Sequence, residues 1–176
     1  MKYTRAKILS NKKIVDGIYE MVVAEDSIVK PGQFYMLKHQ GGTLLPRPIS
    51  ISESKDGKVT FVYATVGKGT KEFASLTEND YIELTGPLGN GFDVDKKYGN
   101  VALVSGGIGI APMVMLAREL RKRNKGIILN KCLPKWKNNW IKDAVRKTTK
   151  YVETICWKIK LFRLGEIKIN GSFWKK

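Results

Sequence analysis

The chain has 176 residues, of which 43% are hydrophobic, and a formal net charge of +16. This length allows one large domain or two small ones, and the hydrophobic share excludes a disordered chain. No apolar run is long enough to span a bilayer, and the start of the chain lacks the apolar stretch of a signal peptide. The two cysteines, Cys132 and Cys156, do not suggest a disulfide framework, so we expect a cytoplasmic protein.

The positive charge is concentrated in one part of the chain. Residues 1–124 contain 18 Lys and Arg and 13 Asp and Glu, a net charge of +5, whereas residues 125–176 contain 14 and 3, a net charge of +11. All four tryptophans and both cysteines also lie in the second part. The composition therefore divides the chain into two unlike parts that meet near Asn124.

The first hundred residues predict β-structure. Short strands are separated by turns at Asp16–Gly17, at Pro31–Gly32 and at residues 55–58, and a short helix is expected over residues 70–76. The expected strands cover residues 5–14, 18–25, 33–39, 47–54, 59–66 and 81–88. Six short strands with regular turns indicate a small antiparallel barrel or sandwich.

Residues 100–124 predict a strand, a glycine turn and a helix. Val101–Val104 is apolar throughout, as a strand buried on both faces should be. The helix has apolar residues at helical spacing. Its polar side includes Arg118 and further basic residues, which are favourable near the C-terminal end of a helix. The apolar positions are Met113, Leu116, Ala117 and Leu120. This unit opens an α/β domain, with a boundary near residue 98.

After this unit the pattern weakens. Residues 126–129 could supply a second parallel strand, residues 140–147 a helix and residues 155–161 a further strand. No other strand–turn–helix unit follows. The domain that begins near residue 99 is therefore expected to be incomplete.

One arginine stands in an unusually rigid place. Arg47 lies between two prolines at the start of an alternating strand, and Pro48 fixes its direction. A guanidinium can bind a pyrophosphate through two parallel hydrogen bonds. Alternation along the strand places Ser50 on the opposite face from Arg47. Taken by itself, this arginine is better explained as a surface residue of an edge strand.

Three glycine-rich stretches are compatible with phosphate binding. In VSGGIGIAPM, glycines follow a buried strand and precede a helix, with Pro112 where the dinucleotide fingerprint has its third glycine. In VGKGT, Gly69 and Thr70 precede the short helix, with Thr70 as its N-cap. GPLGNGF, residues 86–92, lies beside the expected domain boundary, where ligands often bind. A packing or linker role explains each stretch equally well in isolation.

The five stretches PGQF, RPISI, VYATVGKGT, GPLGNGF and VSGGIGIAPM together resemble the ferredoxin–NADP reductase superfamily. Within it, the chain is similar to the electron-transfer subunits of NAD-dependent (class 1B) bacterial dihydroorotate dehydrogenases, over about residues 1–124. The resemblance implies an N-terminal antiparallel FAD-binding β-barrel over residues 1–98. An incomplete Rossmann-like NAD-binding α/β domain would follow over residues 99–176.

The resemblance also implies which residues bind the cofactors. Arg47 would meet the FAD pyrophosphate and Ser50 would lie near the reactive flavin nitrogen, while the family often has an arginine where this chain has Ala64. The FAD residues would be Arg47, Pro48, Ile49, Ser50, Val62, Tyr63, Ala64, Gly69 and Thr70. The NAD(H) residues would be Gly106, Gly107, Gly109, Ala111 and Pro112. No catalytic side chain is expected, because the cofactors themselves exchange the hydride.

The family passes electrons from FAD through a 2Fe–2S cluster to FMN in a catalytic partner subunit, within a heterotetramer. In this way dihydroorotate oxidation for pyrimidine biosynthesis reduces NAD+. The cluster needs four cysteine thiolates, and Cys132 and Cys156 cannot supply them. No other metal site is expected, and His39 is predicted to be a surface residue rather than a general base.

Three accounts of residues 125–176 are possible. They could be out-of-frame or otherwise foreign sequence, a divergent tail for an acidic partner or nucleic acid, or the basic end of an α/β domain. We favour the first, because composition changes abruptly where the resemblance stops.

Two other functions compete with the dihydroorotate dehydrogenase type. One is the small subunit of a sulfide dehydrogenase or a ferredoxin:NADP oxidoreductase, whose sequence around the flavin arginine tends to differ. The other is a basic nucleic-acid-binding protein, which the net charge of only +5 on residues 1–124 disfavours. We therefore expect neither nucleic acid nor a membrane as partner.

Overall fold

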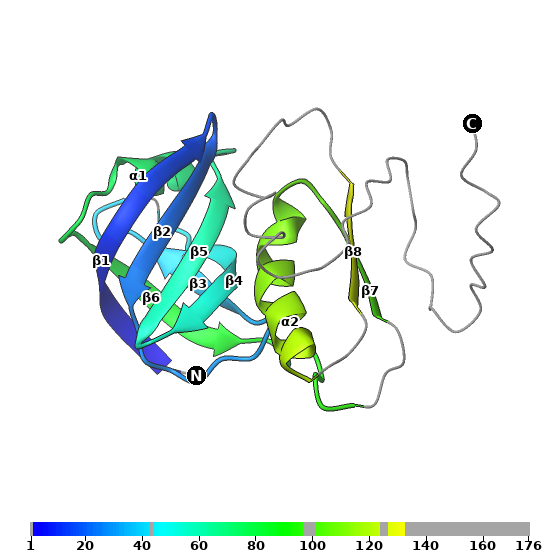
Figure 1. Cartoon of the computed structure of the whole chain (residues 1–176). Coiled ribbons are helices and arrows are strands. Elements are labelled where there is room, and N and C mark those ends of the chain that lie inside the picture. Colours follow the sequence, from blue (N-terminus) through cyan, green and yellow to red (C-terminus); the bar gives the residue numbers. More distant parts are fainter. Residues whose placement is uncertain (1, 43, 97–100, 124–126, 133–176) are drawn as a thin grey trace.

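The computed structural model describes residues 2–42, 44–96, 101–123 and 127–132. Figure 1 shows the arrangement of the elements. The strands are β1 (Lys2–Val15), β2 (Ile18–Ala24), β3 (Phe34–Lys38), β4 (Arg47–Lys55), β5 (Lys58–Ala64), β6 (Tyr81–Leu88), β7 (Val101–Gly106) and β8 (Ile127–Cys132). The helices are α1 (Lys68–Ser75), the 3₁₀-helix η1 (Gly107–Ile110) and α2 (Ala111–Lys122).

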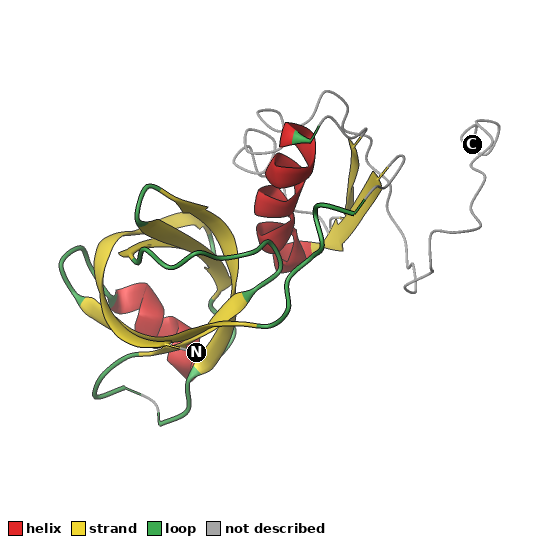
Figure 2. Ribbon diagram, turned by 90° about the horizontal axis from the view of Figure 1, so that it is seen from below, coloured by secondary structure: helices red, strands yellow, loops and turns green. Residues whose placement is uncertain are grey.

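The first six strands form a closed antiparallel barrel in the order β1–β2–β5–β4–β3–β6. Strand β1 closes it, because its first half pairs with β6 and its second half pairs with β2. Figure 2 looks into the barrel, with α1 across the opening. The barrel predicted from the sequence is thus confirmed, and the sandwich alternative is excluded. Closure removes the free strand edges that an open sheet would expose.

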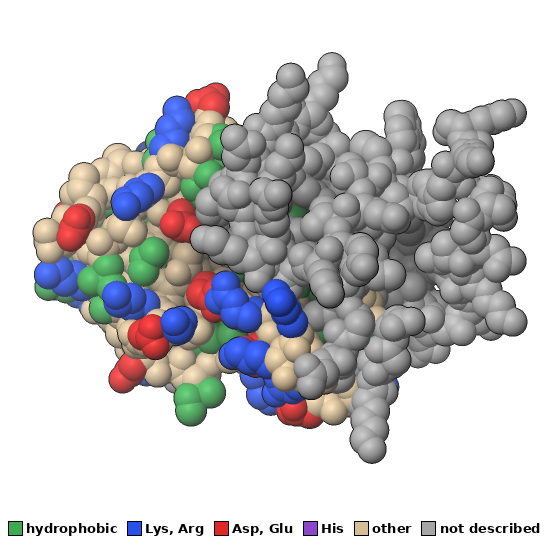
Figure 3. All heavy atoms as spheres, in the orientation of Figure 1, with side chains coloured by type: hydrophobic (Ala, Val, Ile, Leu, Met, Phe, Trp, Pro, Cys, Tyr) green, Lys and Arg blue, Asp and Glu red, His purple; other side chains and the backbone are tan. Residues whose placement is uncertain are grey.

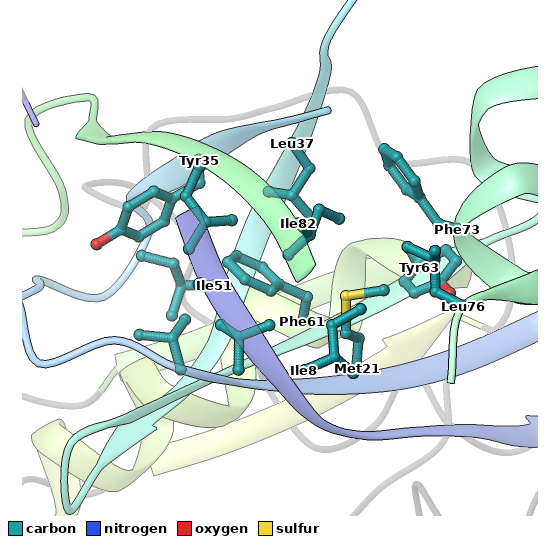
Figure 4. Close-up of a cluster of buried hydrophobic side chains, with 14 of the residues drawn as sticks. Ile8, Met21, Tyr35, Leu37, Ile51, Phe61, Tyr63, Phe73, Leu76 and Ile82 are labelled. Atoms are coloured by element: carbon teal, nitrogen blue, oxygen red, sulfur yellow. The ribbon is translucent and has the colours of Figure 1, made fainter. Parts of the chain in front are cut away.

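The barrel is filled by residues that alternate along its strands. In β5, Val59, Phe61 and Tyr63 are almost fully buried and point inward. Phe61 meets Tyr35 edge to face, with ring centroids 5.8 Å apart. Figure 4 shows this cluster, which Phe73 of α1 also enters. The alternation of apolar and polar residues in the sequence therefore corresponds to side chains that point into and out of the barrel.

Asn11 fixes α1 to the barrel. Its side-chain amide donates hydrogen bonds to the carbonyl oxygens of Phe73 and Leu76, both at 2.8 Å. Its carbonyl oxygen accepts a hydrogen bond of 3.0 Å from the Tyr63 hydroxyl. The half-buried amide of one residue on β1 thereby provides hydrogen-bond partners for two carbonyl groups at the end of the helix and for the buried hydroxyl of Tyr63 on β5.

The strand–turn–helix unit lies beside the barrel. Helix α2 stands between the barrel and the parallel pair β7–β8 (Figure 1). The apolar positions predicted for the helix pack toward Leu103 of β7. Met115, on another face of α2, packs with the core residues of the barrel. This helix therefore joins two hydrophobic clusters.

Several expected bounds differ from the structure. Strand β1 begins at Lys2 and not near residue 5, and α1 begins at Lys68 and not at residue 70. The second parallel strand is β8, which is longer than the expected 126–129 and continues to Cys132. The expected boundary near residue 98, the helix over 140–147 and the strand over 155–161 lie outside the described residues.

The glycine-rich loop after β6 is packed onto the Pro31–Gly32 turn. The Phe92 N–H donates a hydrogen bond of 2.8 Å to the Pro31 carbonyl, and the Gln33 side chain donates one of 2.7 Å to the Gly89 carbonyl. A Cβ at Gly32 would lie 2.6 Å from the Phe92 ring. PGQF and GPLGNGF are therefore partly explained by their packing against each other.

A matched pair of leucines tests the core of the barrel. Leu37 is 0% exposed, and Leu44 in the following loop is 82% exposed. We expect Leu37→Ala to lower the free energy of unfolding by about 2–5 kcal/mol, because it leaves a cavity. Leu44→Ala should change it by less than about 0.5 kcal/mol. Urea unfolding followed by circular dichroism measures both, and equal effects would contradict the assigned core.

A pair of glycines tests the packing of the loop after β6. Gly32 and Gly57 both have positive φ, +88° and +70°, but a Cβ at Gly57 would meet nothing within 4 Å. Gly57→Ala should lower the free energy of unfolding by about 1 kcal/mol through backbone strain alone. Gly32→Ala should lower it by roughly 1–3 kcal/mol more, because the methyl group meets the Phe92 ring. Adding Phe92→Ala should remove most of this excess in the same unfolding assay.

Candidate functional site

The predicted FAD residues of β4 and β5 lie together at one end of the barrel. The ladder between these strands runs from Lys55↔Lys58 to Ile51↔Phe61. Residues 47–50 and 62–64 lie beyond its last pair, and residues 47–50 pair instead with β3. Two predicted cofactor stretches, one on each strand of the β4–β5 hairpin, therefore flank the gap where the ladder ends.

Arg47 and Ser50 emerge on opposite faces of β4. The irregularity in β4 falls between Ile51 and Glu53, so alternation from Arg47 to Ser50 is uninterrupted. Ser50 shares the outer face with Val62 and Ala64 of β5, because Ile49 and Ile51 contact the core. Arg47 is half-buried, and none of the ion pairs among the described residues involves it. Its guanidinium is therefore available to an anion.

The side chains of β5 limit how a ligand could contact that strand. Tyr63 points into the barrel, stacks on Tyr19 with ring centroids 5.9 Å apart, and is 1% exposed. Burial raises the pKa of the Tyr63 hydroxyl well above its ordinary value, although the hydrogen bond to Asn11 opposes this rise. Val62 is 3% exposed. A ligand beside β5 would therefore meet the backbone and Ala64 rather than these two side chains.

The start of α1 differs from its expected form. Gly67 is the N-cap and Thr70 is the third helical residue, so the assignment of Thr70 as N-cap is wrong. The Thr70 hydroxyl accepts hydrogen bonds from the N–H groups of Val66 at 3.0 Å and Gly67 at 3.2 Å, and donates to the Gly67 carbonyl at 3.1 Å. The reason is geometric, since a hydroxyl three residues into the helix can reach back to its first backbone groups. This hydroxyl holds the loop, and Gly69 beside it is buried.

The turn after β7 is exposed and rich in glycine. Gly106 ends β7, and Gly107, with φ +54°, begins η1. A Cβ built on Gly109 meets nothing within 4 Å, and no positive φ requires glycine there. Ala111 is 1% exposed and Pro112 occupies the first turn of α2. Within the described part of the chain, packing therefore does not explain Gly109.

This turn is brought next to the barrel. The 3₁₀-helix η1 approaches β5, and α2 lies along β4. The Ser105 hydroxyl, just before the turn, is buried and has no hydrogen-bond partner among the described residues. The tertiary structure thus places the predicted nicotinamide turn against the strand that carries Val62 and Ala64.

The structure also locates the residues for which no cofactor role was predicted. His39 is half-buried, and its carbonyl accepts a hydrogen bond of 3.1 Å from the Gly42 N–H. Among the described ranges, no three His, Cys, Asp or Glu residues form a group that could hold a metal ion. No helix in those same ranges is long and apolar enough to cross a membrane.

A groove of about 740 Å³ lies at the other end of β4, between the barrel and α2. Its lining includes the tip of the β4–β5 hairpin, Phe92, Met115 and Arg123, together with six carboxylates, but none of the predicted cofactor residues. On the barrel face drawn in Figure 3, basic and acidic side chains are interspersed and do not form a basic stripe. The groove and the predicted cofactor site are therefore separate features.

Sequence reasoning missed the contacts that fix α2 to the barrel. Arg118 was assigned to the polar side of the helix, but it forms an ion pair with Glu53 of β4. Met115 was not assigned to a core, and it is 6% exposed. Met115 and Arg118 are three residues apart, which places them on one side of the helix. That spacing indicates a second contact face on α2, but it does not identify the partner strand β4, which is far away in the sequence.

The chain is similar in sequence to several curated proteins, although no family model matches it. It is 54% identical over 127 residues to the dihydroorotate dehydrogenase B (NAD(+)) electron transfer subunit of Clostridium perfringens, which covers 72% of this chain and 51% of that protein. It is 48% identical over 124 residues to the corresponding subunit of Clostridium acetobutylicum, covering 70% and 50%. The chain thus spans about half the length of the curated relatives it matches.

Solved structures with the same fold include several reductases. An NADH-dependent reduced ferredoxin–NADP oxidoreductase matches with a TM-score of 0.64 and 31% identity, over 74% of this chain and 48% of that one. Phthalate dioxygenase reductase matches with a TM-score of 0.72 and 22% identity, over 88% and 51%. A ferredoxin–NADP+ reductase of Neisseria gonorrhoeae with bound FAD and NADP matches with a TM-score of 0.73 and 18% identity, over 89% and 68%. The chain is therefore homologous, over its aligned residues, to dihydroorotate dehydrogenase B electron transfer subunits, and it has a ferredoxin–NADP reductase-like fold.

Proposed function

We propose that this chain binds FAD at the end of the barrel where β4 and β5 separate, and binds NAD(H) at the glycine turn before α2. It would carry electrons between NAD(H) and a partner dehydrogenase subunit, as in dihydroorotate oxidation for pyrimidine biosynthesis. The two domains would be the barrel, over residues 1–98, and a partial nucleotide-binding domain from residue 99. FAD, when bound, supplies the hydride exchange with nicotinamide.

One observation carries this proposal. Three predicted cofactor stretches converge: residues 47–50 and 62–64, at the open end of one hairpin, and the turn at residues 106–109, which lies far along the sequence from both. Two of them flank the gap in the β4–β5 ladder, and the third approaches β5. Hydride exchange requires the two rings to be held close together, so one convergent site suits this chemistry better than separate sites would.

The residues of β4 suit a flavin dinucleotide. Arg47 has no ion-pair partner among the described residues, so it can bind the pyrophosphate without first breaking an ion pair. Pro48 restricts the backbone beside it. Ser50 points to the outer face, toward the side on which η1 and α2 lie. The phosphates and the ring would thus be bound from opposite faces of one strand.

The turn before α2 suits the nicotinamide nucleotide. Gly106, Gly107 and Gly109 are exposed, and the open space at Gly109 lets a phosphate approach the backbone. Ala111 and Pro112 begin the helix behind the turn, whose N-terminal end attracts an anion. At α1, by contrast, Thr70 already uses its hydroxyl within the loop. A phosphate there would have to meet backbone N–H groups.

The electron partner would be an FMN-containing catalytic subunit. The relatives are named electron transfer subunits, which implies a second subunit that exchanges electrons with them. A 2Fe–2S cluster would need four cysteine thiolates, and the sequence shown has two cysteines, of which Cys156 lies outside the described residues. The residues present do not fit that cluster, so we derive no electron step through it.

One observation supports a second candidate function. The matched NADH-dependent reduced ferredoxin–NADP oxidoreductase is 31% identical to this chain, so a subunit of such a complex is the competing candidate. Identities of 48% and 54% to the dihydroorotate dehydrogenase subunits favour the first function. Mixing the flavin-loaded chain with each kind of partner and measuring NADH-dependent reduction of that partner would discriminate between them.

A charge-removal pair tests the FAD site. The purified chain, incubated with FAD and desalted, should retain the visible flavin absorption bands. Arg47→Gln should weaken FAD binding by roughly tenfold to a hundredfold, because a charge-assisted hydrogen bond to the pyrophosphate is lost. Arg5→Gln, on the outer face of β1 where Arg5 lies 4.7 Å from the Tyr81 ring, should leave it unchanged. Failure of the wild-type chain to bind FAD would contradict the proposed function.

A single methyl group tests the nicotinamide turn. Gly109→Ala should leave the free energy of unfolding unchanged or raise it by up to about 1 kcal/mol, because the added Cβ meets open space. It should weaken NADH binding by roughly tenfold, because the methyl group prevents close approach of the pyrophosphate to the backbone. Titrating the FAD-loaded chain with NADH measures the affinity, and an unchanged value would overturn the assignment of this turn.

A further inference from the structure

Helix α2 is held from two sides. On one side, Leu116, Ala117 and Leu120 pack with the cluster around Leu103 of β7. On the other side, Met115 packs with the core residues of the barrel. The helix is therefore positioned by the barrel as well as by its own strands.

A bulge in β4 provides the polar part of this contact. Ile51 pairs with Phe61 and the next pair is Glu53 with Thr60, so Ser52 is an extra residue, and it is 3% exposed. Without the bulge, Glu53 would share the inward face of Ile51. The extra residue turns Glu53 outward, where its carboxylate forms an ion pair with the Arg118 guanidinium.

This contact is linked to the glycine turn through a rigid element. Helix α2 continues directly from η1 at Ala111, and Arg118 lies seven residues further along, about 10 Å by the rise of a helix. A tilt of the helix at Arg118 would therefore move Gly107–Ile110 relative to β5.

We propose that the Glu53–Arg118 ion pair, together with Met115, acts as a positioning device that holds the glycine turn against β5. It thereby sets the distance between nicotinamide and flavin, and this second part rests on the proposed function. Neither Glu53 nor Arg118 belongs to the predicted cofactor residues. The bulge of β4 turns Glu53 outward, and the ion pair with Arg118 then fixes the orientation of α2.

The experiment uses the full chain with three variants and a matched control. Glu53→Gln and Arg118→Gln each remove one charge, and the double variant Glu53→Arg with Arg118→Glu reverses the pair. Asp95→Asn is the control, because it removes a carboxylate that accepts a hydrogen bond of 2.9 Å from Arg123, the C-cap of α2, and leaves Glu53 and Arg118 unchanged. Two readouts are measured: amide hydrogen exchange of the cofactor-free chain, and the rate of flavin reduction by saturating NADH in the FAD-loaded chain.

We expect each single variant to speed exchange at residues 107–110 by about tenfold, with exchange in the barrel strands unchanged. Flavin reduction at saturating NADH should slow by about tenfold, while FAD affinity stays within about twofold. The reversed pair should restore both, and Asp95→Asn should change neither.

Unchanged exchange at residues 107–110 in the single variants, or no restoration by the reversed pair, would overturn the positioning role. Altered exchange with an unaltered rate of flavin reduction would overturn the claim that the pair sets the distance between nicotinamide and flavin. If the wild-type chain binds no FAD, the proposed function fails and the link to flavin distance fails with it. The exchange data then decide whether the pair holds the turn.

Discussion

The arrangement of this protein depends on one extra residue in a strand. The bulge at Ser52 interrupts the alternation of β4, so that Ile51 fills the barrel and Glu53 faces outward. An uninterrupted strand would bury a carboxylate in an apolar core, which costs several kcal/mol unless it is paired. The bulge instead directs that charge to Arg118 of α2. A local defect in one ladder thereby provides the polar contact between the barrel and the strand–turn–helix unit.

The motifs that suggest cofactor binding differ in their physical origin. Gly32 and the loop after β6 are explained by contacts within the chain, because the Phe92 ring occupies the space above Gly32. Thr70 likewise serves its own loop. Gly109 has no such explanation among the described residues, and neither does Arg47. The positions that packing leaves unexplained are the ones that a ligand would account for.

The sequence allowed the barrel and the parallel unit to be predicted because both rest on local periodicity. Alternation marked the strands, and the recurrence of apolar residues marked α2. Element ends were less well predicted, since β1 and α1 begin earlier than expected. The cofactor residues were proposed from resemblance. The β4–β5 hairpin brings residues 47–50 and 62–64 together, but the approach of η1 to β5 could not be derived from spacing, because it depends on tertiary contacts.

The sequence by itself determined which strand residues alternate between inside and outside, where the turns lie, and the apolar side of α2 that packs on β7, since each depends on neighbours within a few residues. Only the tertiary structure decided how β4 separates from β5 beyond Ile51 and how Glu53 meets Arg118. The first feature depends on the register of β4 against its neighbouring strands, where a shift of one residue reverses every side chain. The second depends on a helix tens of residues further along the chain. The register of β4 is what places the candidate site beside α2.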